Sequence, residues 1–231
     1  MHRVVVVVVG LAACAGHGVR TEPLPQAAPT SLAGVTPQLV PGERIAWDVF
    51  WQGMAIGRAQ LGVDAREAHT TFRTGALASA LANVRYDLRS GAGHATEVLT
   101  HGGSTEQTEV TIDAAGYRVD GAPERAAPGG GRVLTLTTAL GVVRTWSRGA
   151  APPPAFVWLV HRGDLYRLDV FSPVAADWQG HEALRVDAMV RAFDRSTSVE
   201  LSVWLAATPD RTPVRFVVRA GGERVSAELA D

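Results

Sequence analysis

The sequence predicts a mainly β protein, in which an antiparallel sheet is curled into a barrel, half-barrel or sandwich, with one or two short helices. Three observations predict this class. Apolar and polar residues alternate with a period of two in about ten segments after Pro41. Turn-forming residues separate those segments, and a helical period occurs in only two places. Many short strands joined by turns favour an antiparallel sheet that curls or closes.

The N-terminus has the layout of a secretory leader. Arg3 precedes an apolar run from Val4 to Ala13, which is far shorter than the roughly 20 residues that a membrane span needs. Leu11-Ala12-Ala13-Cys14 resembles the lipobox of bacterial lipoproteins, and Cys14 is the only cysteine. This resemblance implies that residues 1–13 are a cleaved signal peptide and that Cys14 is acylated. The alternative is a buried valine strand with an incidental cysteine.

Lipidation at Cys14 would anchor an exported protein in the cell envelope, since several acyl chains hold a protein stably on a bilayer. No aspartate follows Cys14, which by the same resemblance favours the outer membrane, facing the periplasm. Residues 14–40 are rich in Pro, Gly and Ala and predict an extended tether of roughly 30 Å. The alternative is that part of this segment packs along the domain. Residues 41–231 then form a single β-rich domain.

Two hairpins frame that domain. In the first, the alternating segment 45–52 is followed by a turn over 53–57 and a second strand through Val63. In the second, the strands 199–205 and 214–218 flank a turn at 208–211, and a last strand runs from 223 to 229. Further strands are expected at about 69–75, 85–90, 95–100, 106–113, 117–120, 132–137, 164–172 and 183–193. Helical spacing predicts a helix over 139–146 with a cap at 137–138, and a shorter helix over 77–84.

The opening and closing of this domain resemble the bacterial family of unknown function DUF3108. The opening motif is Pro41-Gly42-Glu43 followed by Ile45, Trp47, Asp48 and a glycine pair. The closing motif is a Trp-Leu strand, a turn with Asp210-Arg211, and a Pro-Val strand, and a helix ending near Arg144-Thr145-Trp146 lies between the two. The turn residues 206–209 depart from the family pattern. The resemblance covers about 41–231 and implies an envelope location and a mainly β fold, but no activity.

Composition narrows the function. The net charge is −1 and lysine is absent, which argues against a nucleic-acid binder and excludes lysine-based catalysis. The histidines lack metal-ligand spacing and are expected on the surface or in loops, so we expect no metal, no cofactor and no catalytic residue. Two carboxylate pairs, Glu43 with Asp48 and Asp164 with Asp169, leave a catalytic pair open. We favour structural roles, such as an Asp48 pair with Arg58 across the hairpin.

Aromatic residues are the more suggestive feature. Trp47, Trp51, Trp204 and Phe216 are expected on strands, where they fill a core or line an apolar cavity. Three functions remain: a non-catalytic binding module for an apolar ligand such as a lipid, in which the helix over 139–146 acts as a lid; a scaffold for an envelope protein complex; and, least favoured, an envelope hydrolase.

Overall fold

The computed structural model describes residues 30–80, 82–114, 116–194 and 197–231. The signal peptide, Cys14 and residues 15–29 of the expected tether lie outside the described residues. The described chain forms one sheet with the strand order β1-β10-β11-β13-β14-β15-β16-β2-β3-β4-β5-β6-β7-β8, and with β12 beside β13 and β9 beside β10. β1 and β8 end this order as edge strands, so the curled sheet is not closed by pairing of its ends. The predicted class, a mainly β protein with a curled antiparallel sheet, is confirmed.

The strands of the first half are β1 (Thr30–Ser31), β2 (Arg44–Trp51), β3 (Met54–Val63), β4 (Glu67–Thr74), β5 (Val84–Gly91), β6 (His94–His101), β7 (Ser104–Ile112), β8 (Tyr117–Val119) and β9 (Val133–Leu134). Those of the second half are β10 (Ala155–His161), β11 (Asp164–Val170), β12 (Val174–Trp178), β13 (His181–Ala192), β14 (Ser198–Ala206), β15 (Pro213–Ala220) and β16 (Glu223–Leu229). The helices are α1 (Ala76–Ser79) and α2 (Leu136–Trp146), and Pro128–Gly130 forms a 3-10 turn.

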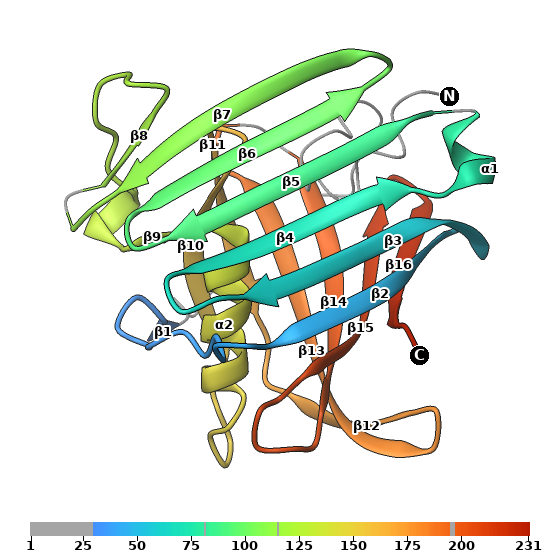
Figure 1. Ribbon diagram of the computed structural model, residues 1–231. Coiled ribbons are helices and arrows are strands. Elements are labelled where there is room, and N and C mark those ends of the chain that lie inside the picture. Colours follow the sequence, from blue (N-terminus) through green and yellow to red (C-terminus); the bar gives the residue numbers. More distant parts are fainter. Residues whose placement is uncertain (1–29, 81, 115, 195–196) are drawn as a thin grey trace.

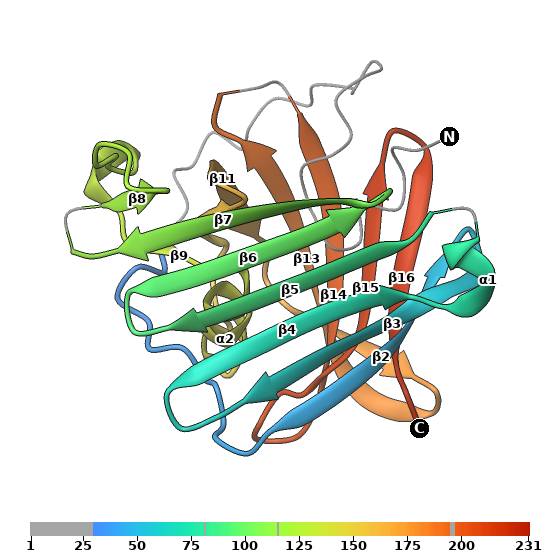
Figure 2. The same cartoon turned by 45° about the horizontal axis from the view of Figure 1, so that its top comes forward.

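The curl brings two walls face to face. Strands β2 to β8 form one wall, β10, β11 and β13 to β16 form the other, and α2 stands between them (Figure 1 and Figure 2). Each wall turns its apolar residues inward because alternate residues of a strand face opposite sides. On β13, for example, Val186, Ala188 and Val190 are buried. The core therefore lies between the walls and around α2.

The first hairpin turns more tightly than expected. Gln52 and Gly53 both have positive φ angles, 48° and 85°, which is the backbone of a two-residue hairpin loop. β3 therefore begins at Met54, and the expected turn over 53–57 was too long. Gly57 lies inside β3, where a Cβ atom would come 2.2 Å from the carbonyl oxygen of Arg73. This glycine serves close packing of two strands rather than a turn.

α2 begins earlier than predicted. Thr135, and not Thr137 or Thr138, is its N-cap, and the Thr135 hydroxyl accepts a hydrogen bond from the backbone N–H of Thr138. The strand expected over 132–137 is therefore reduced to β9. β10 had no counterpart among the predicted strands, because residues 155–160 form a continuous apolar run with no alternation. The structure covers both faces of that run, so alternation is not required there.

Part of the expected tether packs on the domain. β1 pairs in parallel with β10, and Leu32 is buried in the core. The backbone N–H of Gln38 donates to the carbonyl of Gly141 on α2, at 2.9 Å. A side chain at Gly141 would meet the Gln38 backbone at about 3.1 Å, so glycine allows this approach. Residues 30–40 therefore pack along the domain, which was the alternative to an extended tether.

Candidate functional site

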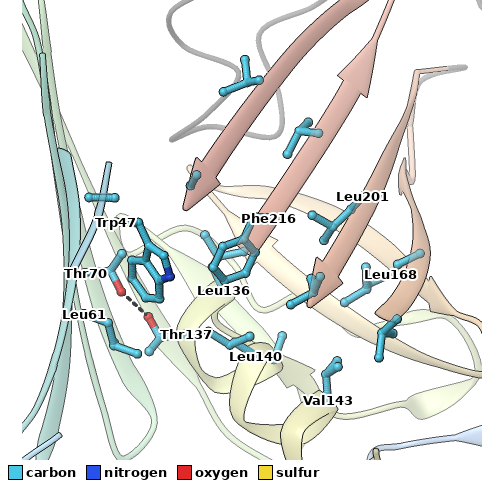
Figure 3. Close-up of a pocket in the computed structure, with 18 of the residues that line it drawn as sticks. Trp47, Leu61, Thr70, Leu136, Thr137, Leu140, Val143, Leu168, Leu201 and Phe216 are labelled. Carbon is cyan, nitrogen blue, oxygen red and sulfur yellow. Dashed lines mark hydrogen bonds between the residues drawn. The ribbon is translucent and has the colours of Figure 1, made fainter. Parts of the chain in front are cut away.

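An apolar cavity of about 190 Å³ lies between α2 and the inner face of the curled sheet (Figure 3). The helix contributes Leu136, Thr137, Ala139, Leu140 and Val143. The sheet contributes Trp47, Ala59, Leu61, Thr70, Leu168, Val170, Val186, Ala188, Leu201, Val203, Phe216, Val218, Val225, Ser226 and Ala227. These residues come from eight strands, β2 to β4, β11 and β13 to β16, so the cavity follows the curl of the sheet.

The chemistry of the lining is uniform. None of the lining residues carries a formal charge, and apart from the indole N–H of Trp47 the polar side-chain groups in the lining are the hydroxyls of Thr70, Thr137 and Ser226. Charged side chains of the same strands point outward, as Arg185 and Asp187 do beside the cavity residue Val186. A solute in this cavity would therefore meet apolar atoms almost everywhere.

Two of the four predicted aromatic residues meet at the cavity. Trp47 and Phe216 both line it, with ring centroids 5.4 Å apart in an edge-to-face arrangement. The indole N–H of Trp47 donates to the backbone carbonyl of Pro213 at 2.8 Å, so this buried nitrogen is satisfied. The contact joins β2 to β15, which are far apart in sequence.

The other two predicted aromatic residues lie elsewhere. Trp51 packs at the end of β2 and donates its indole N–H to the Glu223 carboxylate at 2.8 Å. Trp204 lies on the opposite face of β14 from Val203, and its ring stacks with the Arg215 guanidinium at 5.0 Å. Neither residue lines the cavity. A bulge after Val49 and the alternation of β14 account for these positions.

A buried arginine fixes the helix to the walls. Arg144, near the end of α2, has an exposed fraction of 0%, and its two terminal nitrogens donate to the two carboxylate oxygens of Glu43, each at 2.8 Å. Its Nε and Nη2 also donate to the backbone carbonyl of Asp210, at 3.0 and 2.8 Å. Bidentate, charge-assisted hydrogen bonds of this kind are roughly twice as strong as those between neutral groups. We call Glu43, Arg144 and Asp210 the arginine clamp.

The arginine clamp was not predicted, although all three residues stand in the motifs that carry the resemblance to DUF3108. Sequence spacing gave no signal because Glu43 and Arg144 are 101 positions apart, and Arg144 and Asp210 are 66 apart. The structure shows what these motifs share: the opening, the helix and the closing turn meet at one guanidinium group. Glu43 thus has a structural partner and does not pair with Asp48.

A second buried polar cluster ties the two walls together. The Tyr86 hydroxyl donates to Glu97 Oε2 at 2.8 Å, and His161 Nδ1 lies 2.7 Å from the same oxygen. The backbone N–H of Arg162 donates to Glu97 Oε1 at 2.9 Å. His161 has an exposed fraction of 0%, so the prediction of surface or loop histidines is wrong for it. The physical reason is that Glu97 on β6 provides a partner for the ring inside the core.

Burial and partners shift the pKa values in this cluster in opposite directions. Burial is the largest influence on Glu97 and raises its pKa, but the charge and hydrogen bond of His161, together with the Arg162 N–H and the Tyr86 hydroxyl, bring the pKa below its ordinary value. Burial, followed by the charge of Glu97, raises the pKa of Tyr86 well above its ordinary value. None of these residues lines the cavity.

Of the other carboxylates that the sequence singles out, Asp48 and Asp169 have arginine partners. Asp48 stands opposite Arg58 on the neighbouring strand, with 3.9 Å between Oδ1 and Nε, as the alternation predicted. Asp169 accepts hydrogen bonds from Arg167 and Arg191 at 2.8 and 2.7 Å. Within the described ranges, no group of three or more His, Cys, Asp or Glu side chains is placed to hold a metal ion.

Comparison with known proteins shows the fold alone. Searches for a matching protein family and for a matching curated relative give none. The chain is similar to the crystal structure of a β-barrel-like protein of the domain of unknown function DUF1849 from Brucella abortus, with a TM-score of 0.58 and 9% identity over 84% of this chain and 98% of that one. At this identity the likeness supports the mainly β, barrel-like architecture. The resemblance to DUF3108 stays a prediction.

Among the described residues, no helix is both long enough and apolar enough to pass through a bilayer.

Proposed function

We propose that this protein is a non-catalytic cell-envelope lipoprotein whose domain binds one narrow apolar chain, such as the acyl chain of a lipid, between α2 and the curled sheet. The observation that carries the proposal is the uncharged cavity of about 190 Å³ along α2. Close-packed protein interiors contain few voids larger than a water molecule. A void this size needs either a ligand or a reason to stay empty.

The size and the chemistry of the cavity favour a chain over a bulky ligand. Sites for drug-sized molecules are usually about 300–1,000 Å³, whereas a dry apolar cavity of about 150 Å³ already accepts benzene. A volume of about 190 Å³ therefore suits a slender apolar group. A charged group inside would lose its hydration with no ion partner in the lining, which is costly. The charged or polar end of a lipid would remain outside.

The proposal includes the location predicted from the leader. The acyl chains on Cys14 would hold the exported protein at the outer membrane. The residues after Cys14 would connect this anchor to the domain, which would therefore stay close to lipid ligands. Its partners would be the membrane, through Cys14, and an apolar small molecule. The side chains of the arginine clamp and of the Tyr86–Glu97–His161 cluster are bonded to each other inside the protein. This supports a role for them in holding a rigid scaffold around the cavity rather than in a reactive centre.

A scaffold for an envelope complex is the second function, and one observation favours it. Phe193 is 60% exposed and its ring packs edge-to-face on Trp158 at 5.8 Å. Aromatic residues, phenylalanine included, are enriched at protein–protein interfaces. This surface is small beside the cavity, so the binding module remains the preferred function.

Native mass spectrometry followed by lipid extraction tests the proposed function. The chain from residue 14 onward, carrying Cys14→Ser to prevent acylation, is purified from bacteria under mild conditions. We expect about one apolar molecule per chain. An empty protein that also fails to take up added medium-chain lipids would contradict the binding module and favour the scaffold.

A matched pair of variants separates the cavity from the rest of the core. Ala188 lines the cavity, whereas Ala155 is fully buried outside it. Ala188→Leu places a larger side chain in the void and should abolish ligand uptake while leaving the fold intact. Ala155→Leu should retain uptake in the molecules that fold, because it crowds the core elsewhere.

A further inference from the structure

The hydroxyl groups of the cavity define a second, more specific property, which rests on the proposed function. Thr70 of β4 and Thr137 of α2 face each other across the cavity edge, with 3.1 Å between their Oγ1 atoms (Figure 3). Thr137 is 3% exposed and both residues line the cavity. Among the lining hydroxyls, these two are joined by a hydrogen bond, which links a strand of the sheet to the helix.

A count of donors shows that this pair has a hydrogen left over. Two threonine hydroxyls carry two O–H donors, and the single hydrogen bond between them uses one. In the described part of the chain, neither hydroxyl has another hydrogen bond to protein. One O–H of this half-buried pair therefore has no protein acceptor among the described residues, at the edge of a cavity lined almost wholly by carbon, where a donor without a partner is unfavourable.

We infer that the Thr70–Thr137 pair binds the neutral carbonyl oxygen of an ester- or amide-linked acyl chain whose hydrocarbon part fills the cavity. An acyl carbonyl offers the missing acceptor. A carboxylate or phosphate would also accept the hydrogen bond, but no lining residue carries the positive charge that a buried anion requires. The cavity therefore selects an esterified or amidated acyl chain over a free fatty-acid anion, and a carbonyl-bearing chain over a plain alkane.

Three probes of similar length test this selection: methyl decanoate, decanoic acid and tridecane. Their binding to the chain from residue 14 onward, with Cys14→Ser, is measured by displacement of an apolar fluorescent dye at neutral pH. The informative quantity is the ratio of ester affinity to alkane affinity in each variant. Taking this ratio removes the effect of any change in the cavity that alters the affinities for the ester and the alkane by the same factor.

Isosteric variants remove the hydroxyls in steps. In the double variant Thr70→Val/Thr137→Val the ester oxygen would be buried without a donor, so the ester-to-alkane ratio should fall by roughly fivefold or more. Each single variant leaves one hydroxyl, whose O–H is free to donate to the ester, so each should keep the ratio within roughly twofold. Thr71→Val, on the opposite face of the same strand, is the control and should change nothing. Melting temperatures check that all variants fold.

The outcomes separate this inference from the proposed function. An unchanged ratio in the double variant, or tight binding of the decanoate anion at neutral pH, would overturn the carbonyl site while the apolar chain-binding function stands. Failure of all three probes to displace the dye from the wild-type chain, or failure of the dye itself to bind, would overturn the proposed function and this inference with it.

Discussion

The arginine clamp offers the sharpest test of how the helix is held against the sheet. In Glu43→Gln, the Arg144 guanidinium keeps its two hydrogen bonds to the Asp210 carbonyl but loses the carboxylate charge of Glu43. Arg144 is 0% exposed and the Glu43 side chain is 11% exposed, so water does little to replace the lost charge. Breaking a buried pair by removing one partner costs about 3–5 kcal/mol. Because glutamine still accepts one hydrogen bond, we expect the lower end, about 3 kcal/mol.

Urea unfolding followed by tryptophan fluorescence measures this loss, because Trp146 on α2 and Trp47 on β2 both lie in the core. The midpoint should fall with little change in the slope m, which would show that stability and not the denatured state has changed. For a domain of this size, a loss of about 3 kcal/mol corresponds to a melting temperature lower by about 6–12 °C. Arg148→Met is the matched control. Arg148 is exposed just after the end of α2 and its guanidinium donates to the Pro209 carbonyl, so the loss of this side chain should cost less than about 0.5 kcal/mol.

A double-variant cycle decides whether the two side chains act as a pair. Arg144→Met alone leaves Glu43 and the Asp210 carbonyl without their donors, but the combined variant Glu43→Gln/Arg144→Met no longer has a buried charge. The combined cost should be smaller than the sum of the single costs by roughly 1–3 kcal/mol. Costs that add to within about 0.5 kcal/mol would refute the reasoning.

Four further predictions concern the cavity, the buried cluster and the anchor. Ala188→Leu should change the unfolding free energy by less than about 1 kcal/mol, whereas Ala155→Leu should lose about 1–3 kcal/mol, since only the first has space to enter. Equal losses in the two variants would argue against the void. Because the pKa of Glu97 is lowered in the folded protein, the stability that its ionised form contributes is present above the ordinary glutamate pKa. This contribution is lost as the pH falls through the pKa of Glu97 in the folded protein. Glu97→Gln should therefore flatten the acid side of a curve of unfolding free energy against pH. The raised pKa of Tyr86 means that its share is present below the ordinary tyrosine pKa and is lost as pH rises beyond it; Tyr86→Phe should remove that alkaline loss, and a persistent alkaline loss would point to another group. Cys14→Ser in the full chain should move the protein out of the membrane fraction of bacterial cells, and continued membrane retention would count against lipidation at this residue.

Most of the strand pattern follows from the sequence because alternation is a local property. β2 was placed within one residue of its observed limits, and β16 (Glu223–Leu229) at its observed limits. The errors have local causes as well. β10 lacks alternation because both of its faces are covered, and α2 displaced the end of an expected strand because Thr135 rather than Thr137 caps it.

The candidate site was accessible to sequence reasoning only in part. Trp47 and Phe216 could be singled out as large aromatic groups on apolar strand faces, but the same argument selected Trp204, which lies on the other side of its strand. Alternation shows which residues of a strand share a face, but the curl of the sheet decides which of the two faces is enclosed. No local sequence pattern specifies the direction of the curl. The arginine clamp and the Glu97–His161 pair are not predictable from the sequence for a related reason. A charged residue that is buried beside a distant partner has no local pattern that distinguishes it from a charged residue on the surface.

The sequence by itself determined the class of fold, the positions of most strands and turns, and the basis for expecting a lipid anchor at Cys14, because each depends on neighbouring residues. Only the tertiary structure decided that α2 stands between two walls of one curled sheet, that Arg144 joins Glu43 to Asp210, and that an uncharged cavity with one threonine pair remains beside the helix. These features arise from contacts between residues far apart in the chain. Their energies depend on burial and on partner distance, which the order of residues does not specify.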